Sequence, residues 1–120
     1  MTMYIAKVKV DVTPTDGQPP VIRISQHDSG SRILITLTDG ADLYTVPDGA
    51  AVTLRGKTPD GDGISEDLEH FGSDVTLVTN ENVSGVSGQC ICKLMVHAGE
   101  ARLSTQMFLI EVEPDPAVTR

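Results

Sequence analysis

Two cysteines with one residue between them are the first groups in this sequence that could do chemistry. Cys90 and Cys92 lie in a run of alternating apolar and polar residues, so a strand would place both thiols on one face with Leu94 and Val96. A metal site needs more ligands than these two thiols, and His97 falls on the opposite face of the same strand. Residues two apart in a strand also bridge poorly as a disulfide. We therefore interpret both cysteines as small apolar core residues.

His27, Asp28 and Ser29 follow one another directly, and these three residue types make up the catalytic triad of many hydrolases. Triad members are brought together by folding from separate places in a chain, and three consecutive residues in a turn cannot all converge on one another. We therefore interpret residues 27–29 as a polar turn. The sequence contains no other set of residues that would support a hydrolase.

Asp60 and Asp62 raise the question of a calcium loop, because such loops use aspartates at alternate positions. The EF-hand pattern also requires an oxygen ligand at its fifth position and a glycine at its sixth, where this chain has Ile64 and Ser65. Further acidic residues at 66–69 leave open an adventitious cation. We expect a solvated turn here, and we predict neither a metal site nor a cofactor.

The composition is that of one small globular domain with an acidic surface. The chain has 120 residues, 39% of them hydrophobic and 3% aromatic, and a net charge of −8. This charge would repel a nucleic acid, and the few aromatic rings disfavour a dedicated carbohydrate module. No apolar run reaches the roughly 20 residues of a membrane span. The first five residues lack the apolar stretch of a signal peptide, so we expect a protein made in the cytoplasm and not exported by that route.

Alternating apolar residues between glycine- and proline-rich turns predict an all-β fold, an antiparallel β-sandwich of the immunoglobulin-like type with about eight short strands. We expect one domain over residues 1–113 and an exit linker or tail over residues 114–120. Residues 80–88 form a connection with room for one helical turn, and Phe71 is a candidate core residue. The expected strands lie at residues 3–12, 21–26, 32–38, 43–46, 51–57, 64–67, 73–79, 89–97 and 102–112.

Gly56 interrupts the clearest strand pattern, in which Val52 and Leu54 would face the core. A glycine inside a strand marks either a bulge or the close approach of another backbone segment. Residues 58–61, with the letters T-P-D-G, then fit a type I turn.

The last expected strand changes its pattern near Met107. Leu103, Met107 and Leu109 share one parity, whereas Phe108 and the apolar residues after it share the other. Either a bulge shifts the register near Met107, or both faces of this strand are covered. Two apolar residues of the preceding strand also fall on its expected solvent side. A group of outward apolar residues is typical of a partner surface, and we predict a protein interface at Ile91, Met95, Met107 and Leu109.

Several segments, taken in order, resemble the N-terminal domain of phage baseplate upper proteins, and together they span most of residues 4–113. The most recognisable has the letters G-A-A-V-T-L-R-G-K at 49–57, followed by P-D-G at 59–61. The other segments are V-I-R-I at 21–24 with H-D-S at 27–29, R-I-L-I-T-L-T-D-G at 32–40, Gly88, R-L-S-T-Q at 102–106 and F-L-I-E-V at 108–112.

This resemblance implies a non-enzymatic structural component of the virion, in the tail baseplate of a phage or prophage. Such domains attach a receptor-binding or tail-fibre assembly to the baseplate hub, often as trimers. The implied partners are copies of the chain itself, a hub protein, and a receptor-binding protein or stalk downstream. The family has no catalytic residues. The alternative function, from another class, is an immunoglobulin-like module that binds carbohydrate or a cell surface.

Overall fold

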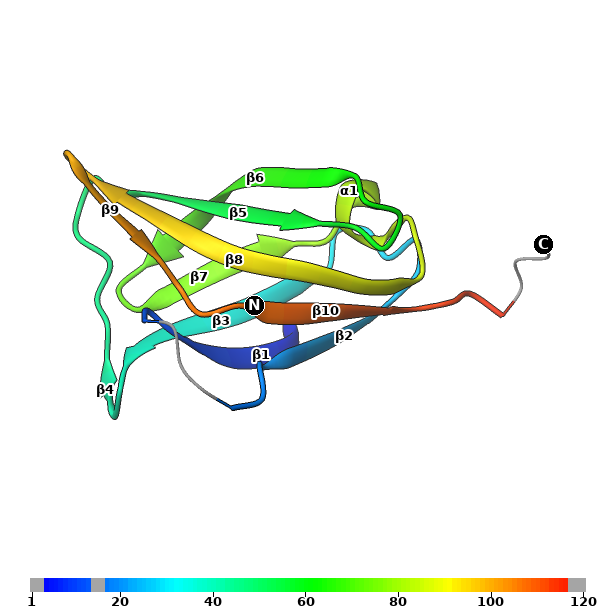
Figure 1. The fold of residues 1–120 in the computed structure, drawn as a ribbon, viewed down its shortest axis with the longest axis horizontal. Coiled ribbons are helices and arrows are strands. Elements are labelled where there is room, and N and C mark those ends of the chain that lie inside the picture. Colours follow the sequence, from blue (N-terminus) through cyan, green and yellow to red (C-terminus); the bar gives the residue numbers. More distant parts are fainter. Residues whose placement is uncertain (1–3, 14–16, 117–120) are drawn as a thin grey trace.

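A computed structural model describes residues 4–13 and 17–116 of the chain. The described residues form ten strands and one short helix (Figure 1). In chain order these elements are β1 (Tyr4–Asp11), β2 (Val21–Ser25), β3 (Arg32–Asp39), β4 (Asp42–Leu43), β5 (Ala51–Lys57), β6 (Gly63–Phe71), β7 (Asp74–Val78), α1 (Glu81–Ser84), β8 (Gly88–Ala98), β9 (Ala101–Ser104) and β10 (Phe108–Glu113).

The strands make one continuous sheet in the order β1-β3-β7-β6-β5-β8-β10-β2, with β4 beside β3 and β9 beside β8. The sheet is continuous because β6 is long enough to have two partners. Its residues 63–68 pair with β5, and its residues 69–71 pair with β7. The two terminal strands, β1 and β2, lie close to each other, so that the sheet forms a nearly closed, barrel-like layer around one interior.

The all-β prediction is confirmed, but the antiparallel immunoglobulin-like sandwich is not what the chain forms. The sheet is mixed, because β1 pairs with β3 in parallel and β10 pairs with β2 in parallel. The first pair is parallel because β2, the strand between them in the sequence, runs back beside β10 instead of beside either of them. Alternation determines which face of a strand is buried, but it does not determine which strand lies beside it.

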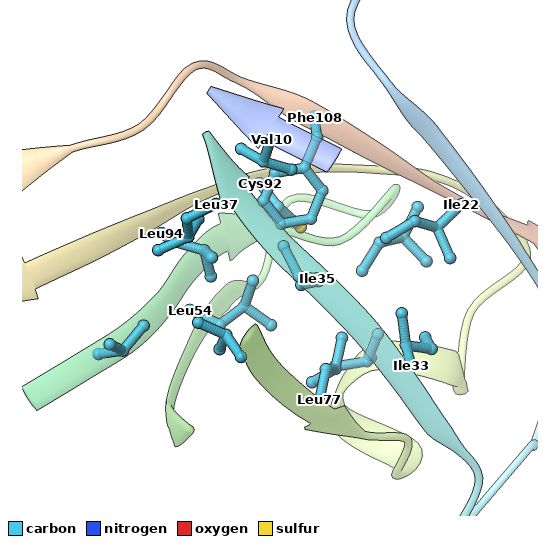
Figure 2. Close-up of a cluster of buried hydrophobic side chains, with 14 of the residues drawn as sticks. Val10, Ile22, Ile33, Ile35, Leu37, Leu54, Leu77, Cys92, Leu94 and Phe108 are labelled. Carbon is cyan, nitrogen blue, oxygen red and sulfur yellow. The ribbon is translucent and has the colours of Figure 1, made fainter. Parts of the chain in front are cut away.

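The interior is filled by the inward side chains of strands on all sides of the sheet, as predicted from the alternation. Figure 2 shows Ile35, Leu54, Leu94 and Phe108 pointing into the same interior, and all four have 0% of their surface exposed. Cys90 and Cys92 belong to this core as free thiols, which confirms their interpretation as apolar core residues.

We predict that both thiols are protected in the folded protein. Burial raises the pKa of the Cys92 thiol to about 12 and also raises the pKa of Cys90, and the thiolate is the reactive form. Native protein at pH 8 should therefore react with iodoacetamide at least about 100-fold more slowly than free cysteine, with both thiols becoming reactive in denaturant. Mass spectrometry of the alkylated protein measures this, and rapid modification of one thiol in the native state would contradict the prediction.

Two strand predictions need correction, and the start of a third cannot be compared with the structure. The expected strand at residues 43–46 is instead β4 at 42–43, because Val46 leaves the sheet, becomes buried and donates its N–H to the carbonyl of Gly72 at 2.9 Å. The expected strand at 64–67 continues to Phe71, which lies beside the turn to β7 and is 88% exposed, so it is not a core residue. The first expected strand began at residue 3, which lies outside the described residues.

The expected helical turn in residues 80–88 is confirmed as α1. Asn80 caps this helix by accepting a hydrogen bond from the N–H of Asn82 at 2.9 Å. Its side-chain amide also donates to Glu66 at 2.9 Å, which ties the helix to β6.

The expected last strand is divided into β9 and β10 by a bulge. Ser104 pairs with Met95, and Phe108 pairs with Cys92, so four steps along one strand correspond to three along the other. The extra residue reverses the parity near Met107, which confirms the bulge rather than the alternative of a strand covered on both faces. Thr105 fills this bulge with 0% exposure.

Thr105 holds the bulge against β8 through backbone and side chain together. Its hydroxyl oxygen accepts a hydrogen bond from the N–H of Leu94 at 3.0 Å, and its own N–H donates to the carbonyl of Leu94 at 3.0 Å. The next residue, Gln106, contacts β1 in the same two-way manner. Its N–H donates to the carbonyl of Asp11 at 2.9 Å, and its side-chain oxygen accepts from the N–H of Asp11 at 2.7 Å. The bulge therefore joins β8 to the edge of β1.

The side chain of Asp11 organises the turn after β1. Its carboxylate accepts hydrogen bonds from the N–H and hydroxyl of Thr13 at 3.0 and 2.8 Å, and from the N–H of Gly40 at 2.9 Å. These bonds, those from Thr13 first, hold the pKa of Asp11 below its usual range because they favour the charged form.

We predict that Asp11 contributes to stability above about pH 4 and that this contribution disappears in acid. A carboxyl whose folded pKa is lowered stabilises the fold above its unfolded pKa of about 3.9, and the effect is lost as the pH falls through the folded value. Asp11→Asn should therefore reduce the free energy of unfolding at pH 7 and show a shallower loss between neutral pH and acid. Urea titrations over this range measure both. Asp62→Asn is the control, since no side-chain hydrogen bond to that carboxylate occurs in the described residues, and parallel curves for Asp11→Asn and the unmodified protein would contradict the prediction.

Candidate interaction surface

The outward faces of β2, β10 and β8 carry apolar side chains next to one another. Leu109 pairs with Ile91 on one side and with Val21 on the other, so these three outward side chains form a row across the sheet. Val21 is 43% exposed, Ile91 is 50% exposed, and Met107, two residues before Leu109, is 42% exposed. We call Val21, Ile91, Met107 and Leu109 the outer apolar patch.

The row faces outward because its sequence neighbours fill the interior. Cys90 and Cys92 flank Ile91, and Phe108 and Ile110 flank Leu109, and all four flanking residues have at most 1% of their surface exposed. The bulge at 105–107 determines which residues of the last strand share the outward side, because without the extra residue Met107 would fall on the inward parity.

Of the four residues predicted to form an interface, the structure brings Ile91, Met107 and Leu109 together and places Met95 apart from them. Met95 lies four residues further along β8, half-buried between its sheet neighbours Thr53 and Ser104. The interface itself stays a prediction for all four residues.

A groove with a basic rim lies beside the outer apolar patch. Ile91 and Met107 line it together with residues of β5, β6 and β8, and no acidic side chain is among its lining residues. The rim consists of Arg55, Lys57 and Lys93, three exposed side chains that take part in no ion pair within the described part of the chain. Three unpaired positive charges therefore surround an apolar floor on a protein whose net charge is −8.

Sequence reasoning missed Val21 and the grouping of the basic residues. The outward orientation of Val21 could be read from its parity with Arg23, and Arg55 and Lys57 follow an obvious outward alternation. Their closeness to the patch depends on the strand order β5-β8-β10-β2, which no local pattern contains.

The polar residues of the apparent catalytic triad make structural contacts in the turns at one end of the molecule. His27 lies with its Nδ1 3.0 Å from a carboxylate oxygen of Glu81, whereas the carboxylate of Asp28 accepts a hydrogen bond from the hydroxyl of Ser31 at 2.8 Å. The first two members of the apparent triad thus contact different partners. Ser84, at the end of α1, donates to the carbonyl of Asp28 at 2.7 Å and joins this turn to the helix.

Residues 58–61 form the predicted turn, and Asp62 joins it through a hydrogen bond to Thr58. The hydroxyl of Thr58 donates to the carboxylate of Asp60 and accepts from the N–H of Asp62 at 3.0 Å, and the N–H of Gly61 donates to the Thr58 carbonyl at 2.9 Å. Within residues 4–13 and 17–116, no three histidine, cysteine, aspartate or glutamate side chains are grouped to hold a metal ion.

The fold and this surface define a small all-β domain with a mixed, nearly closed sheet and an outward apolar patch. Among solved structures it is similar to the N-terminal domain of phage TP901-1 ORF48, with a TM-score of 0.63 and 13% sequence identity over 91% of this chain and 99% of that chain. At this identity the likeness concerns the fold. No protein-family model matches the sequence, and no curated protein matches it. None of the helices in the described ranges has the length and hydropathy that crossing a membrane requires.

Proposed function

We propose that this chain is a non-enzymatic structural domain of a phage or prophage tail baseplate. In this role residues 1–113 attach a receptor-binding or tail-fibre assembly to the baseplate hub through protein–protein contacts, and residues 114–120 lead to the downstream part. The observation that carries the proposal is the fold, which matches a phage domain along nearly its whole length. The resemblance of the sequence segments to baseplate upper proteins supports the same assignment.

The geometry of the surface is consistent with docking. Val21, Ile91 and Leu109 of the outer apolar patch lie on hydrogen-bonded strands, so a partner would meet a surface that needs little reordering. The chain leaves the sheet after Glu113, at the end of the molecule that carries α1 (Figure 1), and the N–H of Asp115 donates to the side chain of Gln26 at 3.2 Å. A stalk would therefore continue from that end, away from the centre of the patch.

No observation favours the alternative function, an immunoglobulin-like module for carbohydrate or cell surfaces. The sheet is mixed and continuous. Of the four aromatic residues in the described part of the chain, Phe108 is buried and Tyr4 and Tyr44 are partly buried, so Phe71 is the one fully exposed ring. Sugar-binding faces usually need several stacking rings.

Co-elution with the hub proteins encoded in the same phage or prophage tail region tests the proposal. We expect the domain and a hub protein to leave a size-exclusion column as one complex, and Val21→Asp with Leu109→Asp to abolish that complex. Leu43→Asp is the matched control, because Leu43 is apolar and 67% exposed but lies on β4, outside the patch. Absence of any complex with the hub proteins, together with specific signals on a glycan array, would overturn the assignment.

A further inference from the structure

We propose that the basic groove beside the outer apolar patch receives the acidic turn at residues 58–62 of a second copy of this chain. This inference rests on the proposed function and adds to it a contact between copies of the chain, the kind of partner that the resemblance implies. It does not depend on which hub protein is bound. It rests on two surfaces of the same molecule whose charges are opposite and whose geometry is set by the β5–β6 hairpin.

The first surface is the groove. Arg55 and Lys57 on β5 and Lys93 on β8 stand on the same outward side, since Lys93 pairs with Arg55 and Ile91 pairs with Lys57. The floor between them is apolar, with Ile91 and Met107 exposed. Apolar contact and charge pairing are therefore available to the same occupant, and that occupant should carry carboxylates.

The second surface is the turn that ends the same hairpin. Asp60 and Asp62 are exposed at its tip and take part in no ion pair within the described residues. The Thr58 hydroxyl donates to Asp60 and accepts from the N–H of Asp62, which holds the turn in place, so presenting both carboxylates to a partner costs little ordering. A neighbouring hollow, lined by Asp60, Asp62 and Glu81, keeps this end of the hairpin acidic.

The basic groove and the acidic turn lie side by side in one molecule, but their charged side chains form no ion pairs with each other within the described residues. Gly63, the first residue after the turn, lines both the groove and the acidic hollow, yet none of the three basic residues forms an ion pair with either aspartate. Each copy thus presents an unpaired basic surface next to an unpaired acidic one. Adjacent surfaces of opposite charge are complementary to the same surfaces on a second copy in a two-fold pair, in which each groove receives the turn of the other copy.

The net charge of −8 on each copy opposes association at long range but does not decide it. At physiological ionic strength charges are screened beyond about 8 Å, so the contact depends on the charges that meet in it. Across that contact the rim of one copy would meet the two aspartates of the other.

A charge-swap experiment tests this pairing. One variant reverses the groove, with Lys57→Glu and Lys93→Glu, and the other changes the turn, with Asp60→Asn and Asp62→Lys, so that residue 60 still accepts the hydrogen bond of Thr58. Light scattering after size exclusion should show multimers of the unmodified protein. Each variant alone should associate at least about tenfold more weakly, and a mixture of the two should regain association, because the reversed groove then faces the reversed turn.

The matched control is Lys7→Glu with Lys9→Glu, an equal charge change at exposed positions of β1, and it should leave association unchanged. Circular dichroism confirms that every variant is folded. A monomeric unmodified protein, or a mixture that does not associate, would overturn this inference. Neither result would affect co-elution with a hub protein, so failure of this contact can be told apart from failure of the proposed function.

Discussion

Replacing Phe108 with alanine is expected to lower the free energy of unfolding by about 3–5 kcal/mol, whereas Phe71→Ala should change it by less than about 0.5 kcal/mol. Phe108 is the first residue of β10 after the bulge, has 0% exposure, and pairs across the sheet with Cys92 in the interior drawn in Figure 2. Removing its ring leaves a cavity that the paired strands around it cannot fill. Phe71 is 88% exposed, so its removal takes little apolar surface away from the folded state.

The two phenylalanine variants form a matched pair, because the side-chain change is identical and only the environment differs. Urea denaturation followed by circular dichroism gives both free energies from the same m-value analysis. A large loss for Phe71→Ala with a small one for Phe108→Ala would mean that the core is organised around the other ring, and it would contradict this structure.

Gly56→Ala is expected to destabilise the fold by about 1–3 kcal/mol. A Cβ at this position would lie 2.4 Å from the carbonyl oxygen of Ile91 and 3.0 Å from the sulfur of Cys92. A backbone oxygen cannot move aside as a flexible side chain would, so β5 and β8 would have to separate at this pair of residues. The sequence leaves two interpretations of Gly56, a bulge or the close approach of another backbone segment. The β5–β8 pairing has no register shift at Gly56, which supports the close approach.

Gly63→Ala is the control for Gly56→Ala, and its effect should have the opposite sign or be absent. Gly63 opens β6, has no atom within 4 Å of an added Cβ and has no positive φ. Alanine there should stabilise by up to about 1 kcal/mol, through the smaller entropy of the unfolded chain. Equal effects of the two substitutions, measured by thermal and urea unfolding, would exclude a specific clash at Gly56.

The strands could be predicted because alternation is a local signal, and their partners could not. The expected bounds of 51–57 are those of β5, and the expected inward residues of β3, Ile33, Ile35 and Leu37, are all buried. The parallel pairs β1–β3 and β2–β10 join residues far apart in the sequence, and nothing in either strand encodes its neighbour. Phe71 was misjudged because hydrophobicity alone does not distinguish an inward position from a place beside a turn.

The candidate surface was predictable to the extent that it depends on parity. The reversal of parity near Met107 is visible in the sequence and leads to Ile91, Met107 and Leu109 on the outward side. Met95 faces outward like Ile91, but it lies beyond Lys93, four residues further along β8. Parity predicts the face of a strand that a residue occupies, and it does not predict which residues lie close together on that face. The basic rim and Val21 join the surface only through strand order, which arises from tertiary packing.

The pairing of β2 with β10 sets the moment at which this protein can finish folding on the ribosome. Val21 is hydrogen-bonded in register with Leu109, 88 residues later in the chain, and β2 has no other ladder partner among the described strands. At translation rates of about 5–20 residues per second, β2 waits roughly 4–18 s after its own synthesis for β10 to emerge. During that interval Ile22 and Ile24 are not yet buried and the backbone of β2 has no strand beside it. A nascent or prematurely terminated chain therefore exposes an aggregation-prone segment until β10 pairs with it.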